Sequence, residues 1–203
     1  MRNGVFAVLF ALTIMGFGAP TWAQTSEDWP CIQPRVVALG IGQMWSGPAL
    51  DSAGDWRSDS ELAQLVSVLA ARRLPLEQAE VMINTVAAAA GTEKNQRLTF
   101  LFAGLFDRMS ASRARIMDGI ERYARRQREL AQRINDTRAK VESRGIGGSM
   151  LGQTAPSDLE QSLTWDTRIY DERSQIITYV CESPVLIEQR LFALARIIQN
   201  NMD

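Results

Sequence analysis

The chain has 203 residues, of which 46% are hydrophobic and 22% charged, and its formal net charge is −1. This balance is typical of a folded domain and excludes a disordered chain. Histidine is absent, which excludes serine–histidine and cysteine–histidine nucleophiles and histidine-ligated zinc, copper or haem. The two cysteines lie too far apart in sequence for a thiolate metal cage, so we expect no metal and no cofactor. An enzyme would have to use carboxylates, tyrosine, serine with lysine, or the backbone, and because no motif of such residues is present we expect no enzyme activity.

The first 23 residues have the pattern of a signal peptide. Arg2 provides a basic start, residues 5–17 are almost entirely apolar, and a small-residue cleavage site ends at Ala23. The apolar run is shorter than the roughly 20 residues that a membrane helix needs. We therefore expect export to a bacterial periplasm, cleavage after Ala23, and no membrane span in the mature chain.

Residues 24–57 are rich in proline, glycine and tryptophan, which predicts an irregular segment. Cys31 lies in this segment and Cys181 lies near the other end of the chain. Because exported proteins meet an oxidising compartment, we expect one disulfide between them, closing a loop of about 150 residues. The alternative is a pair of free or intermolecular thiols.

Residues 58–203 are predicted to form a helical domain. Ser58 and Glu61 have the spacing of a capping box, which predicts a first helix over about 58–73. Pro75 suits the first turn of a second helix over about 75–90, and Gly91 is placed to end it.

A third helix is expected over about 93–143, where apolar residues from Leu98 to Val141 recur at coiled-coil spacing. One extra four-residue step, a stutter, separates Ile116 from Ile120. At about 1.5 Å per residue this helix is longer than a compact domain is wide, so it must protrude.

A similar pattern returns after a glycine-rich tip at residues 144–156. It predicts helices over about 157–182 and 184–199, divided where Pro184 breaks or kinks the helix. If the chain folds back at the tip, the two seams meet wherever two residue numbers add up to about 300. The predicted fold is all-α, a small helical base with a long protruding antiparallel coiled-coil hairpin. An intermolecular coiled coil is the alternative, so a homo-oligomer stays open.

Polar residues interrupt the predicted hairpin seam. Gln127 opposes Arg173, and Asp166 opposes Ile134. Such a layer either fixes the register or forms a buried binding site, and we favour the register. Gly119 lies where the disulfide crosses the hairpin, which suggests a close approach of the backbone there.

Two regions are candidates for interaction surfaces. The first is the set of tryptophans of the N-terminal segment, Trp29, Trp45 and Trp56, which otherwise cover the apolar flank of the base. The second is the tip, where Met150 and Leu151 have no core to fill, so the tip is either an apolar contact or an inert flexible loop.

Residues 107–144 hold eleven Arg or Lys and six Asp or Glu. We expect these arginines to pair along and across the hairpin with the acidic residues of the returning helix, so nucleic acid is not an expected partner. The acidic residues concerned are Glu160, Asp166, Asp171 and Glu172.

Together these features favour an exported, non-enzymatic helical adaptor or scaffold that contacts another protein of the cell envelope. In layout alone it resembles small periplasmic chaperone or adaptor proteins with helical arms. The alternative is a periplasmic module that binds a small ligand between the N-terminal tryptophan segment and the base, near Trp45 and Trp56.

Overall fold

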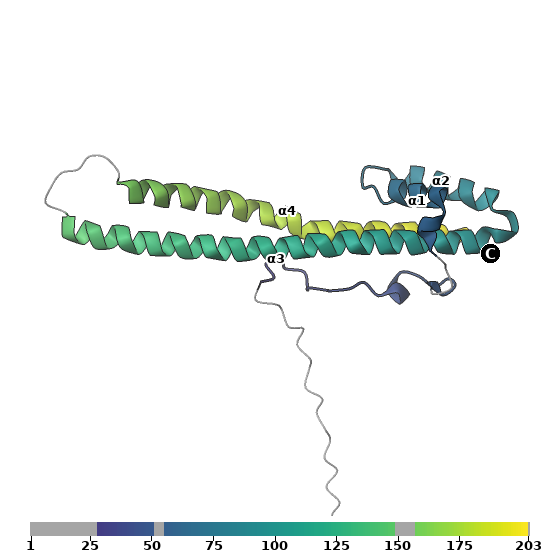
Figure 1. The fold of residues 1–203 in the computed structure, drawn as a ribbon, viewed down its shortest axis with the longest axis horizontal. Coiled ribbons are helices and arrows are strands. Elements are labelled where there is room, and N and C mark those ends of the chain that lie inside the picture. Colours follow the sequence, from purple (N-terminus) through teal and green to yellow (C-terminus); the bar gives the residue numbers. More distant parts are fainter. Residues whose placement is uncertain (1–27, 51–54, 149–156, 203) are drawn as a thin grey trace, which may run out of the picture.

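The computed structural model describes residues 28–50, 55–148 and 157–202. Within these ranges helices are the only regular secondary structure. Two short helices, α1 (Ser60–Leu69) and α2 (Leu76–Ala89), precede two long ones, α3 (Lys94–Gly148) and α4 (Asp158–Asn200). Single 3-10 turns are η1 (Ile41–Gln43), η3 (Trp56–Ser58) and η4 (Gly91–Glu93). Figure 1 confirms the predicted fold class, because α3 and α4 form an antiparallel hairpin that projects from a small helical base.

The long helices keep the predicted register along the hairpin. Near the tip the side chain of Arg133 binds Asp166, and near the base Arg113 binds Glu188, so both pairs of residue numbers add up to about 300. Ile120, Leu130 and Ile134 are buried between the helices, as a coiled-coil seam requires. With 55 residues, α3 spans about 80 Å.

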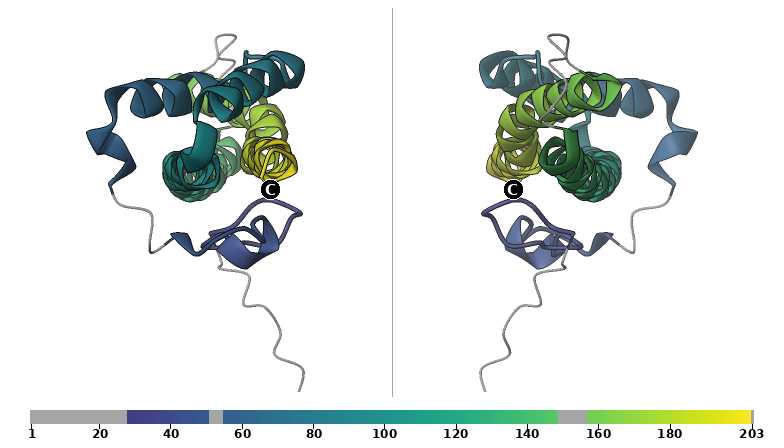
Figure 2. Two further views of the ribbon diagram at one scale, coloured as in Figure 1. Left: turned by 90° about the vertical axis from the view of Figure 1, so that its right-hand side faces the viewer. Right: turned by 90° about the vertical axis from the view of Figure 1, so that its left-hand side faces the viewer.

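The base holds the main hydrophobic core. The apolar stripes of α1 and α2 lie on the proximal part of the hairpin, and the core that they share with the hairpin includes the buried side chains of Phe102, Leu105, Leu191 and Leu194. Figure 2 shows three layers: α1 and α2 on one face of the hairpin, the α3–α4 pair in the middle, and residues 28–50 on the other face. We call residues 28–50 the collar.

Helix caps explain where α1 and α4 begin. Asp59, and not Ser58 as expected, caps α1: its carboxylate accepts hydrogen bonds from the backbone N–H groups of Glu61 and Leu62. These bonds lower the pKa of Asp59, the bond from Leu62 contributing most. The complete capping box of the chain's described part lies instead at the start of α4, between Ser157 and Glu160.

Helix ends also differ from the prediction. Helix α1 ends at Leu69, short of the expected residue 73, and Gly91 follows α2 with a φ of 53°, which favours glycine. Helix α3 continues through the expected stop at Gly145 as far as Gly148. Glycine lowers helix propensity by about 1 kcal/mol but permits helical dihedral angles, so a single glycine does not have to end a helix.

Pro184 does not divide the returning helix, which corrects the expected helices 157–182 and 184–199. It lies inside the continuous α4, and its ring is buried beside the collar and the disulfide. Proline removes one backbone hydrogen bond, whereas the residues on both sides stay packed against α3. Tertiary packing therefore overrides the local preference for a break.

The close backbone approach lies at Gly104 and not at Gly119. A Cβ atom on Gly104 would lie 2.7 Å from Cγ2 of Val66 and 3.0 Å from Cδ2 of Trp56. On Gly119 it would meet only the guanidinium of Arg122, at 3.9 Å. Gly104 is thus the position where α3 lets α1 and η3 come close, and the suggested role of Gly119 is wrong.

Candidate functional site

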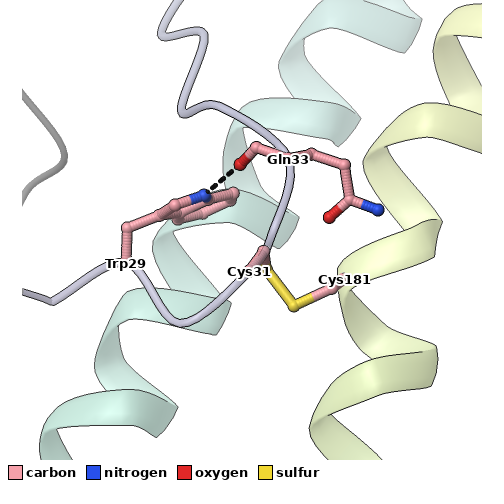
Figure 3. The surroundings of a disulfide bond; sticks show 4 residues. All are labelled: Trp29, Cys31, Gln33 and Cys181. Atoms are coloured by element: carbon pink, nitrogen blue, oxygen red, sulfur yellow. Dashed lines mark hydrogen bonds between the residues drawn. A yellow bond between two sulfur atoms is a disulfide. The ribbon is translucent and has the colours of Figure 1, made fainter. Parts of the chain in front are cut away.

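The collar is bound to the hairpin where the base meets the arm. The arm is the part of α3 and α4 that α1 and α2 do not cover. The predicted disulfide between Cys31 and Cys181 is present, with the two Cα atoms 5.6 Å apart. On either side of it, Asp28 binds Arg125 and Arg128, and Arg35 binds Glu121. Figure 3 shows the tight loop at the disulfide, which the indole N–H of Trp29 closes by donating to the carbonyl of Gln33.

A small pocket of about 230 Å³ opens beside Trp29, between the collar and both long helices. Its apolar walls include Trp29, Tyr123, Tyr170 and Ile177. The hydroxyl of Tyr123 donates to the carbonyl of Arg173, and burial raises the pKa of Tyr123.

Gln127, which also lines the pocket, fits the predicted polar layer only in part. Its amide N–H group donates to the carbonyl of Tyr170 and to Oγ of Ser174, and not to Arg173, whose side chain is exposed. Its amide oxygen is buried and accepts no hydrogen bond from any residue that the structure describes. Ser174 therefore takes the place that the sequence pattern assigned to Arg173.

Asp166 lies in the seam and binds an arginine of α3 across the hairpin. Both carboxylate oxygens accept hydrogen bonds of 2.8 Å from the guanidinium of Arg133. These bonds lower the pKa of Asp166, against burial, which raises it. Because the folded-state pKa lies below that of the unfolded chain, the pair stabilises the fold above the unfolded pKa, and this stabilisation is lost as the pH falls through the folded one.

We predict that Arg133→Gln raises the pKa of Asp166, because burial then acts on the carboxyl without the opposing guanidinium. A carbon-13 NMR titration of the Asp166 carboxyl in wild type and variant measures this change. The matched control is Arg168→Gln, which removes a guanidinium bound to Glu172 on the exposed side of α4 and leaves the Asp166 titration in place. An unchanged pKa in Arg133→Gln would contradict the assignment of the pair.

The three tryptophans of the N-terminal segment have different surroundings. Trp45 is buried and stacks on Phe102, with ring centroids 4.2 Å apart, so it is a core residue. Trp56 packs against Gly104 and carries the guanidinium of Arg57 over its ring, at 4.4 Å from the centroid. Trp29 alone borders the pocket at the hairpin.

A larger groove of about 610 Å³ lies where the α1–α2 layer ends. Trp56, Met109, Ile116 and Ile187 provide apolar lining. Arginines surround it, and small residues of α1 and α3 keep it open. The arginines are Arg57, Arg72, Arg108 and Arg115.

An apolar stripe that was not predicted from the sequence lies on the outside of α4. Its members follow one another after three, four or seven residues, which keeps them on one face of the helix. All except the half-buried Ile169 are exposed, including Trp165 at 63% and Tyr179 at 73%. We call this set the α4 stripe: Trp165, Ile169, Ile176, Tyr179 and Leu186. A search for a second coiled-coil repeat on the same helix would have found it.

Among the residues that the structure describes, most arginines of the arm have no acidic partner on α4, contrary to the expected pairing. Asp166 is the acidic residue of α4 that binds α3 on the arm, whereas Glu172 binds Arg168 on its own helix and Glu160 caps α4. No ion pair within the described ranges involves Arg108, Arg115, Arg122 or Arg126. We call these four residues the α3 arginine row.

Several predictions fall outside the residues that the structure describes. These are the signal peptide over 1–23 and the tip residues Met150 and Leu151. Within the described ranges, no helix is long and apolar enough to cross a membrane, and no group of three acidic or cysteine side chains could hold a metal ion.

Comparisons of the chain with known protein families, with curated proteins and with solved structures find no match.

Proposed function

We propose that this protein is an exported, non-enzymatic helical adaptor or scaffold, chaperone-like in layout, that binds another protein of the cell envelope through its arm. The observation that carries the proposal is the exposed α4 stripe. Exposed aromatic residues gathered on one face are typical of protein interaction sites, where tryptophan and tyrosine contribute most of the binding energy. The disulfide and the signal-peptide pattern support export, because disulfides persist in oxidising compartments.

Site-specific cross-linking in the cells that make the protein tests the proposal. A photoreactive phenylalanine analogue replaces Tyr179 or Trp165 in the stripe, or Val81 on α2 as the matched control, which is 65% exposed. We expect one identified envelope protein to be captured at 179 and 165 but not at 81. That protein should then bind the purified chain and lose binding to Ile176→Ser/Tyr179→Ser.

Capture at 81 alone, or equal capture at all three positions, would contradict the proposal. The same cells test export: the protein should fractionate with the envelope, and its mass should correspond to a chain that begins at Gln24. A full-length chain in the cytoplasm would contradict that part of the proposal.

A second candidate function is the binding of a small ligand in the Trp29 pocket. It is favoured by the amide oxygen of Gln127, a buried acceptor that a ligand donor group could satisfy. Native mass spectrometry of the protein, purified from the envelope without denaturation, should then show a co-purifying molecule that Gln127→Leu releases. A bare polypeptide mass in the wild type would contradict this function.

A further inference from the structure

The face of α4 that carries the α4 stripe continues into the base, where α1 and α2 cover it. The steps of four and three residues along the stripe lead past Leu186 to Arg190, Ala193 and Ile197. There the guanidinium of Arg190 donates to the carbonyl of Leu69 at the end of α1, at 2.8 and 3.0 Å, and Ile197 packs against the core. On the arm the same face has no covering helix in the described part of the chain (Figure 1).

The α3 arginine row borders the same face of the hairpin. Arg108 and Arg115 line the groove together with residues of α1 and with Ile187 of α4, which places them next to the α1–α2 layer. Arg122 follows seven residues later and Arg126 four residues after that, and these spacings keep the four arginines on one side of the helix. The collar lies on the opposite face, where it binds Arg125 and Arg128.

From these observations we propose that the open face of the arm binds one amphipathic helix of a partner protein, with an apolar stripe facing α4 and acidic residues facing the α3 arginine row. This inference rests on the proposed adaptor function and specifies its partner. The bound helix continues the α1–α2 layer and completes a three-helix arrangement on the arm. The α4 stripe extends for about 30 Å, which corresponds to about six helical turns of the partner.

Charge selects an acidic partner. In helical bundles, residues that flank the apolar seam determine which helices pair, because opposite charges attract and like charges repel across the flank. The members of the α3 arginine row make no ion pair with described residues, so glutamates that flank the seam of a partner helix can bind them.

A second copy of the chain fits this face less well. Two hairpins packed face to face and antiparallel place one α3 arginine row against the other, which is repulsive. A parallel arrangement puts two α1–α2 layers on the same side at the same end, where they exclude each other. A separate acidic helix avoids both conflicts.

Designed peptides test the inference with the oxidised mature protein. The probe is a fluorescently labelled peptide of four heptads, with leucine at the seam positions and glutamate at the flanking positions. A matched peptide carries lysine at the same flanks. We expect the glutamate peptide to bind at least tenfold more tightly, as measured by fluorescence anisotropy at physiological salt.

Two sets of variants assign the binding to this face. Ile176→Ser/Tyr179→Ser should weaken the glutamate peptide at least tenfold, whereas the control Val81→Ser should not. Arg122→Glu/Arg126→Glu should reverse the preference in favour of the lysine peptide. Arg73→Glu/Arg196→Glu, which changes the net charge equally at exposed positions of the base, should keep the preference for glutamate.

Equal binding of the two peptides, or a preference that the Arg122 and Arg126 changes do not reverse, would overturn the inference. Sedimentation of the free wild-type protein as a dimer that Ile176→Ser/Tyr179→Ser dissociates would overturn it too, because the face would then bind a second copy. Cross-linking of an envelope protein at 179 and 165 can still succeed when the two peptides bind equally or when the preference is not reversed. The adaptor function and the acidic-helix partner therefore fail separately.

Discussion

Replacement of both cysteines by serine, Cys31→Ser/Cys181→Ser, is expected to lower the free energy of unfolding by about 2–5 kcal/mol. The disulfide spans 150 residues and holds the collar on the hairpin. For a loop of this length the chain-entropy account gives about 5 kcal/mol, and strain or residual structure in the unfolded chain reduces that value. The ion pairs of Asp28 and Arg35 are partly exposed and cannot replace it.

Urea unfolding followed by circular dichroism measures the effect. The reduced wild type serves as the control, because it should match the double variant under the same conditions. Hydrogen exchange of the variant should show faster exchange in residues 28–40 and little change along α3 near Ile134. Equal stability of variant and oxidised wild type would contradict the proposed contribution of the disulfide.

Alanine at two glycines of α3 is expected to have opposite effects. Gly104→Ala places a methyl group 2.7 Å from the buried Val66, and such overpacking costs about 1–3 kcal/mol. Gly119→Ala adds its methyl group at an ordinary contact distance from the flexible side chain of Arg122 and gains about 0.5–1 kcal/mol from the higher helix propensity of alanine.

The two variants control for each other, because the chemical change and the helix are the same. Thermal and urea unfolding should rank Gly119→Ala above the wild type and Gly104→Ala below it. In the double variant Val66→Ala/Gly104→Ala, the shorter side chain at 66 makes room for the new methyl group. Its loss of unfolding free energy should therefore be smaller than the sum of the losses in the two single variants. Stabilisation by Gly104→Ala alone would mean that α1 and η3 do not lie as close to α3 as described.

The fold was predictable from the sequence because its main signals are periodic and long. The seam from Leu98 to Val141 and its matching return set the hairpin register, and the two cysteines, 150 residues apart, set the disulfide. Local signals were less reliable. Asp59 and Ser58 are both good capping residues, and the continuation of α4 through Pro184 depends on packing that only the assembled core provides.

The candidate site was harder to predict, because exposure is a property of the whole fold. Trp45 and Trp29 occur in similar sequence contexts, yet one stacks in the core and the other borders a pocket. Trp165 and Tyr179 lie between the α4 residues that pack on α3. They are exposed because α1 and α2 cover only the base and not the arm. The pairing of Arg133 with Asp166 likewise depends on how the two helices face each other.

The hairpin register has a consequence for the order in which the chain folds. Contacts near the tip join residues close in sequence, such as Arg133 and Asp166, 33 residues apart, while Arg113 and Glu188 are 75 apart and Ser46 and Gln199 are 153 apart. Each earlier contact shortens the loop that the next one has to close, which reduces its entropic cost. We therefore expect the contacts of the hairpin to form from the tip toward the base. Oxidation of Cys31 and Cys181 should follow the pairing of α3 with α4.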